Sequence, residues 1–363
     1  MRTILRIAFC WVAFAAALLL SGVISGILHL PAVPMPGNTP PQTMLLAQLV
    51  AGLVLVVGIF PLARGLAASA PLRAVAVGSF ILLALGVNGM IEAKMFTHFL
   101  DNGIASASVF YVVLAALLGA AFGWSFGAQQ PPVGLPHRSW LAWIPRVAAV
   151  WLAWPVIYFF FGACVSPIVV PYYNAGIAGL RIPPLSVILS VQLVRSVIFL
   201  AASLPFIALW KGSRRGLWLT LGLAHAFTVG LYGLVGATFL PMILRVSHSV
   251  EIAGDSFAYA GLLVLLFAPP RRGKCERTNC WIRAAPAATS SLARSGAKRL
   301  PIASQERGKF PAHKKGRSSC NRKTSLSVSY YASLRRSSLP RPHPRRRILC
   351  TANTTTEKLW FTT

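Results

Sequence analysis

The sequence predicts an all-α integral membrane protein of about eight transmembrane helices, arranged as two parallel four-helix repeats and followed by a disordered basic C-terminal tail. Three observations lead to this fold class. Of the 363 residues, 55% are hydrophobic and 12% are charged, and the mean hydropathy is +0.64, which is more apolar surface than one soluble core can bury. Apolar stretches of roughly 20 residues recur along the chain. Short motifs of the first four stretches reappear in the same order in the last four.

The apolar stretches define the expected helices. The first follows the basic start Met1-Arg2-Thr-Ile-Leu-Arg6 and runs to about Leu28; because it is long and lacks a small-x-small cleavage site, we interpret it as an uncleaved helix. The other seven are 44–62, 74–92, 105–127, 147–168, 186–210, 217–240 and 243–268. These boundaries give a first repeat over 1–128, a cytoplasmic linker over 129–145, a second repeat over 146–269 and a tail over 270–363.

The basic residues of the short connections predict the orientation. One side holds nine of them, Arg2, Arg6, Arg64, Arg73, Arg138, Arg146, Lys211, Arg214 and Arg215. The other side holds three, Lys94, Arg181 and Arg245. Because cytoplasmic loops carry the excess of Lys and Arg, we expect both termini in the cytoplasm and the protein in the bacterial inner membrane.

The two halves of the apolar region share ordered motifs. Arg6, Trp11 and Pro31 recur as Arg146, Trp151 and Pro171, at an offset of 140. Gln48 and Pro61 recur as Gln192 and Pro205, at an offset of 144. His98-x-x-Asp101 recurs as His248-x-x-Glu251, at an offset of 150. Because four helices return the chain to the same side, the repeats should be parallel, related by a pseudo-twofold axis along the membrane normal.

The tail differs sharply in composition from the rest. Residues 271–363 carry 22 Lys and Arg against 3 acids, whereas residues 1–270 carry 13 against 4. Two interpretations stay open: a polybasic arm that binds anionic lipid, or a frameshifted or read-through extension. Nucleic-acid binding is not expected, because no stacking aromatics are regularly spaced among the cations. The six cysteines form no metal-binding framework.

A polar stripe opens the last apolar stretch. At about 100° per residue, Arg245, His248, Glu251, Asp255 and Tyr259 fall within a helical sector of roughly 120°. Such a face avoids lipid. Ionisable side chains inside a membrane segment are costly and need a partner or a cavity.

Arg195 is the clearest charge inside an apolar stretch, nine residues from the start of that stretch, or about 14 Å. We expect an ion pair between Arg195 and Asp255, and we expect Asn88 and Glu92 to satisfy each other. The pair could serve helix packing alone. The alternative is a binding or permeation site between the halves, in which Arg195 favours a small or anionic solute. Its expected lining is Gln48, Gln192, Arg195, His248, Glu251 and Asp255.

Two membrane-embedded enzyme hypotheses on the outer face compete with this site. His98, Asp101, His248 and Glu251 could supply four metal ligands, although the spacing is not that of a His-Glu-x-x-His motif. Alternatively, Cys164 could act as nucleophile, with His248 as base and Arg195 as stabiliser. That set resembles the Cys, Arg and His of membrane-embedded sorting transpeptidases, but the flanking residues differ. His225 is expected to be a hydrogen-bonded structural residue, and Tyr158–Phe161 to be packing bulk. No cofactor is expected.

Two motifs resemble a known group of proteins. They are Ser166-Pro-Ile-Val-Val-Pro-Tyr-Tyr173 and Met242-x-x-Arg245-x-x-His248-x-x-Glu251. The chain resembles, over about residues 160–267, a family of uncharacterised bacterial multi-pass membrane proteins. The resemblance implies a multi-pass membrane protein and brings no activity or catalytic residue. It stops where the tail begins.

Overall fold

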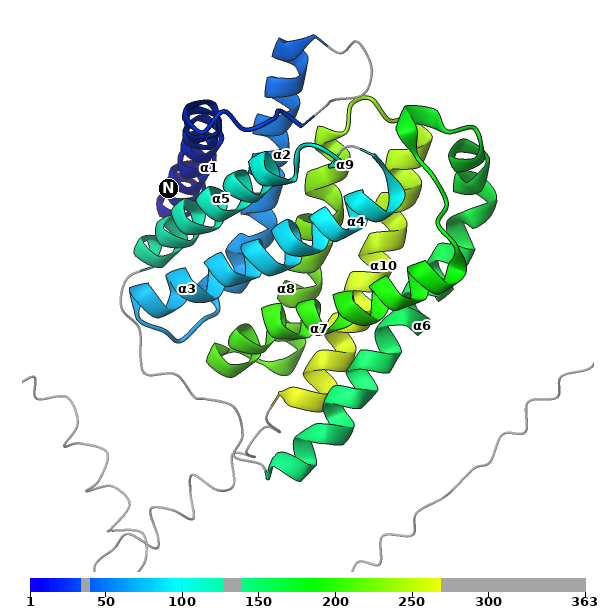
Figure 1. The fold of residues 1–363 in the computed structure, drawn as a ribbon. Coiled ribbons are helices and arrows are strands. Elements are labelled where there is room, and N and C mark those ends of the chain that lie inside the picture. The colour runs from blue at the N-terminus through cyan, green and yellow to red at the C-terminus, as the bar shows by residue number, and fades with distance from the viewer. Residues whose placement is uncertain (34–39, 99, 127–138, 269–363) are drawn as a thin grey trace, which may run out of the picture. The chain divides into compact units, whose positions relative to one another are not determined.

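The computed structural model describes residues 1–33, 40–98, 100–126 and 139–268 of the chain (Figure 1). Within these ranges every regular element is helical, and eight helices are long and apolar enough to cross a membrane. The number of helices predicted from the sequence is therefore confirmed. The expected disordered tail over 270–363 and most of the expected linker lie outside the described residues.

The eight helices are called spans 1 to 8 in chain order. They are span 1, α1 (Arg2–Ile27); span 2, α2 (Pro41–Arg64); span 3, α3 (Ala70–Phe80), η1 (Ile81–Val87) and α4 (Asn88–Phe96); span 4, α5 (Ile104–Ser125); span 5, α6 (Trp140–Asn174); span 6, α7 (Leu185–Leu209); span 7, α8 (Arg214–His225), η3 (Ala226–Leu231) and α9 (Tyr232–Gly236); and span 8, α10 (Met242–Phe267). A short 3₁₀ turn, η2 (Ile177–Gly179), joins α6 to α7.

Span 5 is longer than expected. α6 has 35 residues, or about 52 Å at 1.5 Å per residue, and it begins at Trp140, inside the stretch expected to be a linker. Four prolines lie within it, at 145, 155, 167 and 171. Because each proline removes one backbone hydrogen bond and clashes with the preceding turn, these positions allow the helix to bend.

Spans 3 and 7 each contain a π-helical segment, η1 and η3. A π-helical turn holds more residues than an α-helical turn, so it rotates the side chains that follow it around the helix axis. Asn88 comes directly after η1, and His225 comes directly before η3. Both residues belong to the polar interior described below.

Spans 3 and 4 pack closely through small residues. A Cβ atom added at Gly119 would lie 2.7 Å from Ala74 O and 3.0 Å from Gly78 Cα, and one added at Gly123 would lie 2.6 Å from Ala70 O. Small residues at four-residue spacing allow two helix backbones to approach in this way. α5 also packs on α1, and in the second half α10 packs on both α6 and α8.

An isolated antiparallel β-bridge joins Leu66, after span 2, to Trp210, after span 6. The two backbone hydrogen bonds beside it run from Ala67 N–H to Leu209 O (2.8 Å) and from Lys211 N–H to Gly65 O (3.2 Å). Contacts between the halves continue where α2 packs on α8, η3 and α9, where α7 packs on span 3, and where η1 meets η3.

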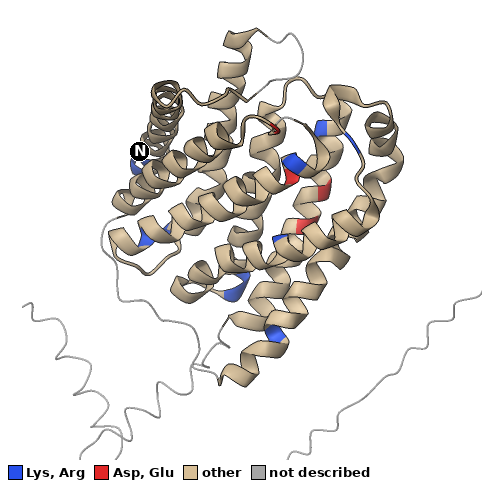
Figure 2. Ribbon diagram, in the orientation of Figure 1, with Lys and Arg blue, Asp and Glu red and all other residues tan. Residues whose placement is uncertain are grey.

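The charged residues of the described ranges are unevenly placed. The described ranges hold four acids, Glu92, Asp101, Glu251 and Asp255, and Figure 2 shows the acids in the upper and middle parts of the bundle, whereas basic residues lie toward both ends. The end of the bundle that holds the connection between α4 and α5, with Asp101, is called the Asp101 end from here on. Glu251 and Asp255 on α10 and Glu92 on α4 line a cavity inside the bundle, which is described below.

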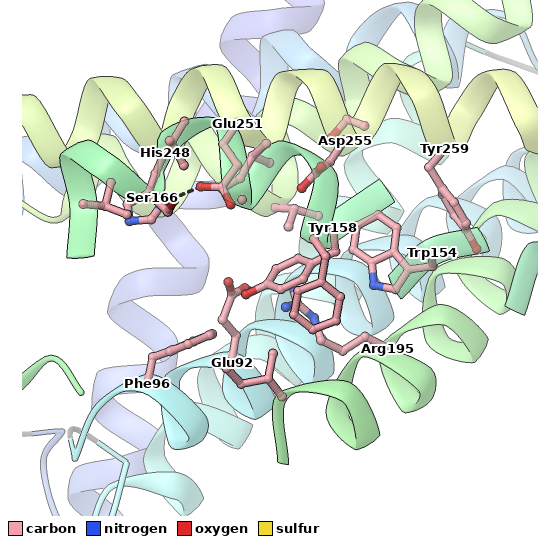
Figure 3. Close-up of a pocket in the computed structure, with 18 of the residues that line it drawn as sticks. Glu92, Phe96, Trp154, Tyr158, Ser166, Arg195, His248, Glu251, Asp255 and Tyr259 are labelled. Atoms are coloured by element: carbon pink, nitrogen blue, oxygen red, sulfur yellow. Dashed lines mark hydrogen bonds and ion pairs between the residues drawn. The ribbon is translucent and has the colours of Figure 1, made fainter. Parts of the chain in front are cut away.

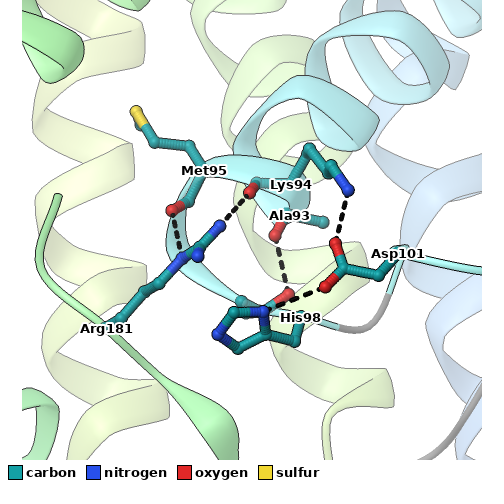
Figure 4. Close-up of polar contacts among 7 residues, drawn as sticks. Ala93, Lys94, Met95, His98, Asp101 and Arg181 are labelled. Carbon is teal, nitrogen blue, oxygen red and sulfur yellow. Dashed lines mark hydrogen bonds and ion pairs between the residues drawn. The ribbon is translucent and has the colours of Figure 1, made fainter.

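The C-terminus of α4 is held by a basic residue at the Asp101 end (Figure 4). Arg181 donates from Nη2 to Lys94 O at 2.8 Å and from Nε to Met95 O at 3.1 Å. A cation at this position satisfies carbonyls that the helix leaves free and opposes the negative end of the helix dipole. The contact ties the connection between α6 and α7 to span 3.

Candidate functional site

A cavity of about 230 Å³ lies inside the bundle, and its lining extends to Phe96, Tyr173 and Ile182, near the ends of α4 and α6 and the start of α7, at the Asp101 end. Spans 3, 5, 6, 7 and 8 all contribute to its wall. Ionisable residues lie on two sides of it: Glu251 and Asp255 extend from α10, and Glu92 and Arg195 face them from α4 and α7 (Figure 3). The volume far exceeds the roughly 10–15 Å³ that one water needs.

Arg195 is held from span 3 rather than from span 8. Its side chain is 2% exposed, about 15 Å from the start of α7. Nε donates to Asn88 Oδ1 at 2.7 Å, and Nη2 donates to Glu92 Oε2 at 2.9 Å. The expected ion pair between Arg195 and Asp255 is therefore wrong: the ionic partner of Arg195 is Glu92. The expected contact between Asn88 and Glu92 is wrong as well, because both residues bind Arg195. Asp255 does line the same cavity.

Three residues form a hydrogen-bonded row near the mouth of the cavity. His248 Nδ1 lies 2.7 Å from Glu251 Oε2, and His248 Nε2 lies 3.3 Å from Tyr173 Oη. The imidazole thus links a phenol on α6 to a carboxyl group on α10, and its tautomer decides which nitrogen donates. Gly162 on α6 lies beside this carboxyl, and a Cβ there would lie 3.4 Å from Glu251 Oε1, an ordinary van der Waals contact.

The stripe on α10 is shorter than expected. His248, Glu251, Asp255 and Tyr259 all line the cavity, as the helical spacing predicts. Arg245 does not; it lines a separate hollow with Met242 and Val246.

Among the described residues that line the cavity, two buried side-chain polar atoms have no hydrogen-bond partner. They are Arg195 Nη1 and Asp255 Oδ1. Asp255 is 4% exposed, so bulk solvent does not satisfy it. Leaving a buried donor or acceptor unpaired costs about 1–3 kcal/mol, and more for charged groups. A molecule inside the cavity that accepts from Arg195 and donates to Asp255 would remove both costs.

His225 lies at the deep end of the cavity and is hydrogen-bonded, as expected. Its Nε2 is 2.8 Å from Ser203 Oγ, and Ser203 Oγ also donates to Phe199 O at 2.7 Å. Because the hydroxyl has one hydrogen, Nε2 must be the donor in the bond with Ser203. The ring packs edge-on against Phe80 and Phe199.

Two of the expected lining residues lie outside the cavity. Gln48 accepts a hydrogen bond from Tyr232 Oη at 3.4 Å, where α2 meets α9. Gln192 is fully buried behind the wall, where its Oε1 accepts from Trp154 Nε1 at 3.0 Å. Gln192 thus orients Trp154, which does line the cavity.

The four residues expected as metal ligands stay in two separate pairs. His98 Nδ1 is 3.0 Å from Asp101 Oδ2, and Lys94 also binds Asp101 (Figure 4). His248 pairs with Glu251 inside the bundle. Among the described residues no three His, Cys, Asp or Glu side chains gather closely enough to hold a metal ion. The four-ligand hypothesis is therefore wrong for this structure.

Cys164 is not placed for the nucleophilic mechanism. Its side chain is exposed on α6, and it does not line the cavity that holds His248 and Arg195. Its neighbours Gly162 and Val165 face the cavity instead. The expected Cys164, His248 and Arg195 set is not brought together.

Several residues of the site were missed at the level of sequence. Asn88 and Glu92 share a helix face, which suggested a mutual contact rather than contacts to span 6. Tyr158 was assigned to packing bulk, yet its ring lies 5.9 Å from the Arg195 guanidinium. A tyrosine among three phenylalanines, one turn after Trp154, is a signal that could have indicated a polar wall.

Comparisons with family models, curated proteins and solved structures give no match. The resemblance of residues 160–267 to uncharacterised bacterial membrane proteins stays a prediction. Function is therefore argued from the geometry of the site.

Proposed function

We propose that this chain is a multi-pass protein of the inner membrane, whose cavity binds a small solute that enters from the outer surface. One observation carries the proposal: Glu92, Arg195, Glu251 and Asp255 surround a single cavity within apolar helices. An ionisable residue at the centre of a membrane helix costs about 2.5–3.5 kcal/mol on insertion scales. Four of them around one space are hard to explain by packing alone.

The proposed architecture is a duplicated bundle of two parallel four-helix halves. The Leu66–Trp210 bridge supports it, because its members lie 144 positions apart, the offset that also relates Gln48 to Gln192. Like every antiparallel bridge it has local twofold symmetry, so it can lie on an axis that relates the two halves. Trp11 Nε1 donates to Leu49 O at 2.8 Å, and Trp151 Nε1 donates to Leu193 O at 2.9 Å, in corresponding places of the two halves.

The proposed orientation places the Asp101 end at the outer surface and both termini in the cytoplasm. The excess of basic residues in the connections at the opposite end supports it. The described acids lie in the upper and middle parts of the bundle in Figure 2, away from the opposite end, which agrees with it. In this orientation the mouth of the cavity faces the outer aqueous phase.

Thiol labelling tests the access that the proposal requires. In a chain whose six cysteines are replaced by serine, Ser256→Cys would place one thiol on the cavity wall. Ser196→Cys is the matched control, because Ser196 is also buried, beside Arg195, but does not line the cavity. Both proteins are treated in right-side-out and inside-out membrane vesicles with a small, membrane-impermeant methanethiosulfonate.

The proposal expects Ser256→Cys to react in right-side-out vesicles at least about tenfold faster than Ser196→Cys, because only the first thiol faces water. Reaction from the inside-out vesicles alone would overturn the orientation. Failure of Ser256→Cys to react from either side would overturn the solute-binding cavity itself.

A further inference from the structure

The two unpartnered atoms of the cavity differ in chemistry. Arg195 Nη1 is a charged donor, and Asp255 Oδ1 is an acceptor. The two residues are 2% and 4% exposed and line the same space from spans 6 and 8. A ligand that carries only a donor or only an acceptor satisfies one of these atoms and leaves the other unpaired.

The balance of charge indicates what Asp255 needs. The cavity wall holds three carboxyl groups, Glu92, Glu251 and Asp255, against the one guanidinium of Arg195. Glu92 is paired with Arg195, and Glu251 is hydrogen-bonded to His248. Asp255 has neither kind of partner within the described residues. Nearby carboxyl groups repel one another when ionised, and an ammonium group placed at Asp255 relieves that repulsion.

The wall beside Asp255 also suits a cation. Trp154 and Tyr158 lie between Asp255 and Arg195 in Figure 3, and Tyr259 lies one turn further along α10; all three line the cavity. Aromatic faces attract ammonium groups, most strongly where water is excluded. Gln192 holds Trp154 in place from behind the wall.

Arg195 retains one free position for an anion. Asn88 and Glu92 occupy Nε and Nη2, and no described residue accepts from Nη1. A purely cationic ligand would be repelled by this group, whereas a carboxylate or phosphate oxygen would bind it through a charge-assisted hydrogen bond. A cavity of about 150 Å³ holds benzene, so the cavity of about 230 Å³ admits a ligand of roughly nine heavy atoms; it is smaller than the roughly 300–1,000 Å³ typical of sites for drug-sized molecules.

We propose that the cavity binds a small zwitterion, with its ammonium group at Asp255 Oδ1 and its anionic group at Arg195 Nη1. This inference rests on the proposed function, because it requires that a solute reaches the cavity. It goes further in naming both ends of the ligand and the residue that receives each one. A water molecule bridging Arg195 and Asp255 is the competing occupant.

A panel of matched compounds tests the assignment. The probes are ω-amino acids from glycine to 6-aminohexanoate, the n-alkylamines of equal carbon number and the n-alkanoates of equal carbon number. Each compound is added to the full-length detergent-purified protein, and the Tm of the protein is measured. The labelling rate is measured on the Ser256→Cys variant with the same compounds. We expect one length of amino acid to raise Tm by about 5 °C or more at about 100 times its Kd and to slow labelling, while its matched amine and alkanoate bind at least about tenfold more weakly.

Asp255→Asn separates binding from folding. Because Asp255 Oδ1 supports no contact in the described structure, this variant should fold with an unchanged Tm and lose at least about tenfold in affinity for the amino acid. Asp101→Asn, outside the cavity, is the control and should keep full affinity.

Three results would overturn the zwitterion. They are equal binding of the matched amine, equal binding of the matched alkanoate, and no shift or protection by any probe, which would leave water as the occupant. If Ser256→Cys still reacts from the outer side in that last case, the accessible cavity survives and only the assignment of its ligand fails.

Discussion

Arg195 Nη2 donates to Glu92 Oε2 at 2.9 Å, across the boundary between the two halves of the chain. Arg195 is buried, whereas the Glu92 side chain is about one-third exposed to the cavity and its mouth. The pair therefore joins span 6 to span 3 while leaving Asp255 without an ionic partner. This relationship separates the structural part of the site from the part available to a ligand.

Loss of one member of this pair should destabilise the fold. We expect Glu92→Met to lower the free energy of unfolding by about 3 kcal/mol, because it leaves a buried guanidinium without its counter-charge. The double variant Glu92→Met with Arg195→Met should lose less than the sum of the two single losses. Unfolding by SDS in mixed micelles, followed by circular dichroism, measures each value.

The control for the pair is Asp255→Asn, which removes the charge once expected to bind Arg195. It should change the free energy of unfolding little, since Asp255 has no partner in the described residues. A larger loss from Asp255→Asn than from Glu92→Met would contradict the pairing seen here.

The close contact of spans 3 and 4 predicts a steric effect at Gly119. We expect Gly119→Ala to reduce stability by about 1–3 kcal/mol, because the new methyl group would press on backbone atoms of Ala74 and Gly78, which cannot rotate away. Gly22→Ala is the matched control, since a Cβ at Gly22 meets nothing within 4 Å and alanine is the better helix former. Equal stability of both variants would show that the two helices do not approach this closely.

The Asp101 carboxyl, in the connection between α4 and α5, should titrate abnormally. The hydrogen bond from Lys94, and next that from His98, lower its pKa below the usual value. The stabilisation from this carboxylate is present above the pKa of the unfolded chain, about 3.9, and is lost as the pH falls through the lower pKa of the folded protein. Because Asp101 is exposed, the effect on overall stability is small.

Selective labelling makes this titration measurable. Asp101 and Asp255 are the only two aspartates of the sequence, so ¹³C-aspartate gives two carboxyl signals that Asp101→Asn assigns. Lys94→Met should move the Asp101 midpoint upward toward the usual pKa. An unchanged midpoint in Lys94→Met would rule out Lys94 as the main cause.

The bond between His225 and Ser203 predicts unequal effects of two substitutions. Ser203→Ala should cost about 1–3 kcal/mol, because it leaves the buried Nε2–H of His225 without an acceptor. His225→Phe removes that donor and keeps a ring against Phe80 and Phe199, so its cost should stay below about 1.5 kcal/mol. Thermal unfolding in detergent compares the two, and a greater loss from His225→Phe would argue for a further polar role of the imidazole.

Sequence reasoning succeeded where one stretch of chain carries the signal. Eight spans were found within a few residues of their observed ends, except at α6 (Trp140–Asn174), which begins earlier and ends later than the expected 147–168. The helical spacing of His248, Glu251, Asp255 and Tyr259 also predicted one common face, and all four line the cavity.

The partner of Arg195 could not be predicted in the same way. Asn88 and Glu92 follow η1, and the π-helical turn changes the direction in which residues after it point. A regular rotation of about 100° per residue therefore misplaces them relative to span 6. Gln48 was assigned to the site by its correspondence with Gln192, yet it lies against Tyr232, because corresponding positions of two halves can meet different neighbours.

Hydropathy over about 20 residues was enough to indicate the number, length and apolar character of the helices. The reason is that the exclusion of apolar groups from water acts on each stretch separately. Which charged side chains meet was decided by the packing of spans 3, 6 and 8, which are distant in sequence. That packing pairs Glu92 with Arg195 and leaves Asp255 Oδ1 without a hydrogen-bond partner among the described residues. It also places Cys164 outside the cavity. Contacts between distant helices depend on rotation and register, and neither is encoded in any single stretch of the chain.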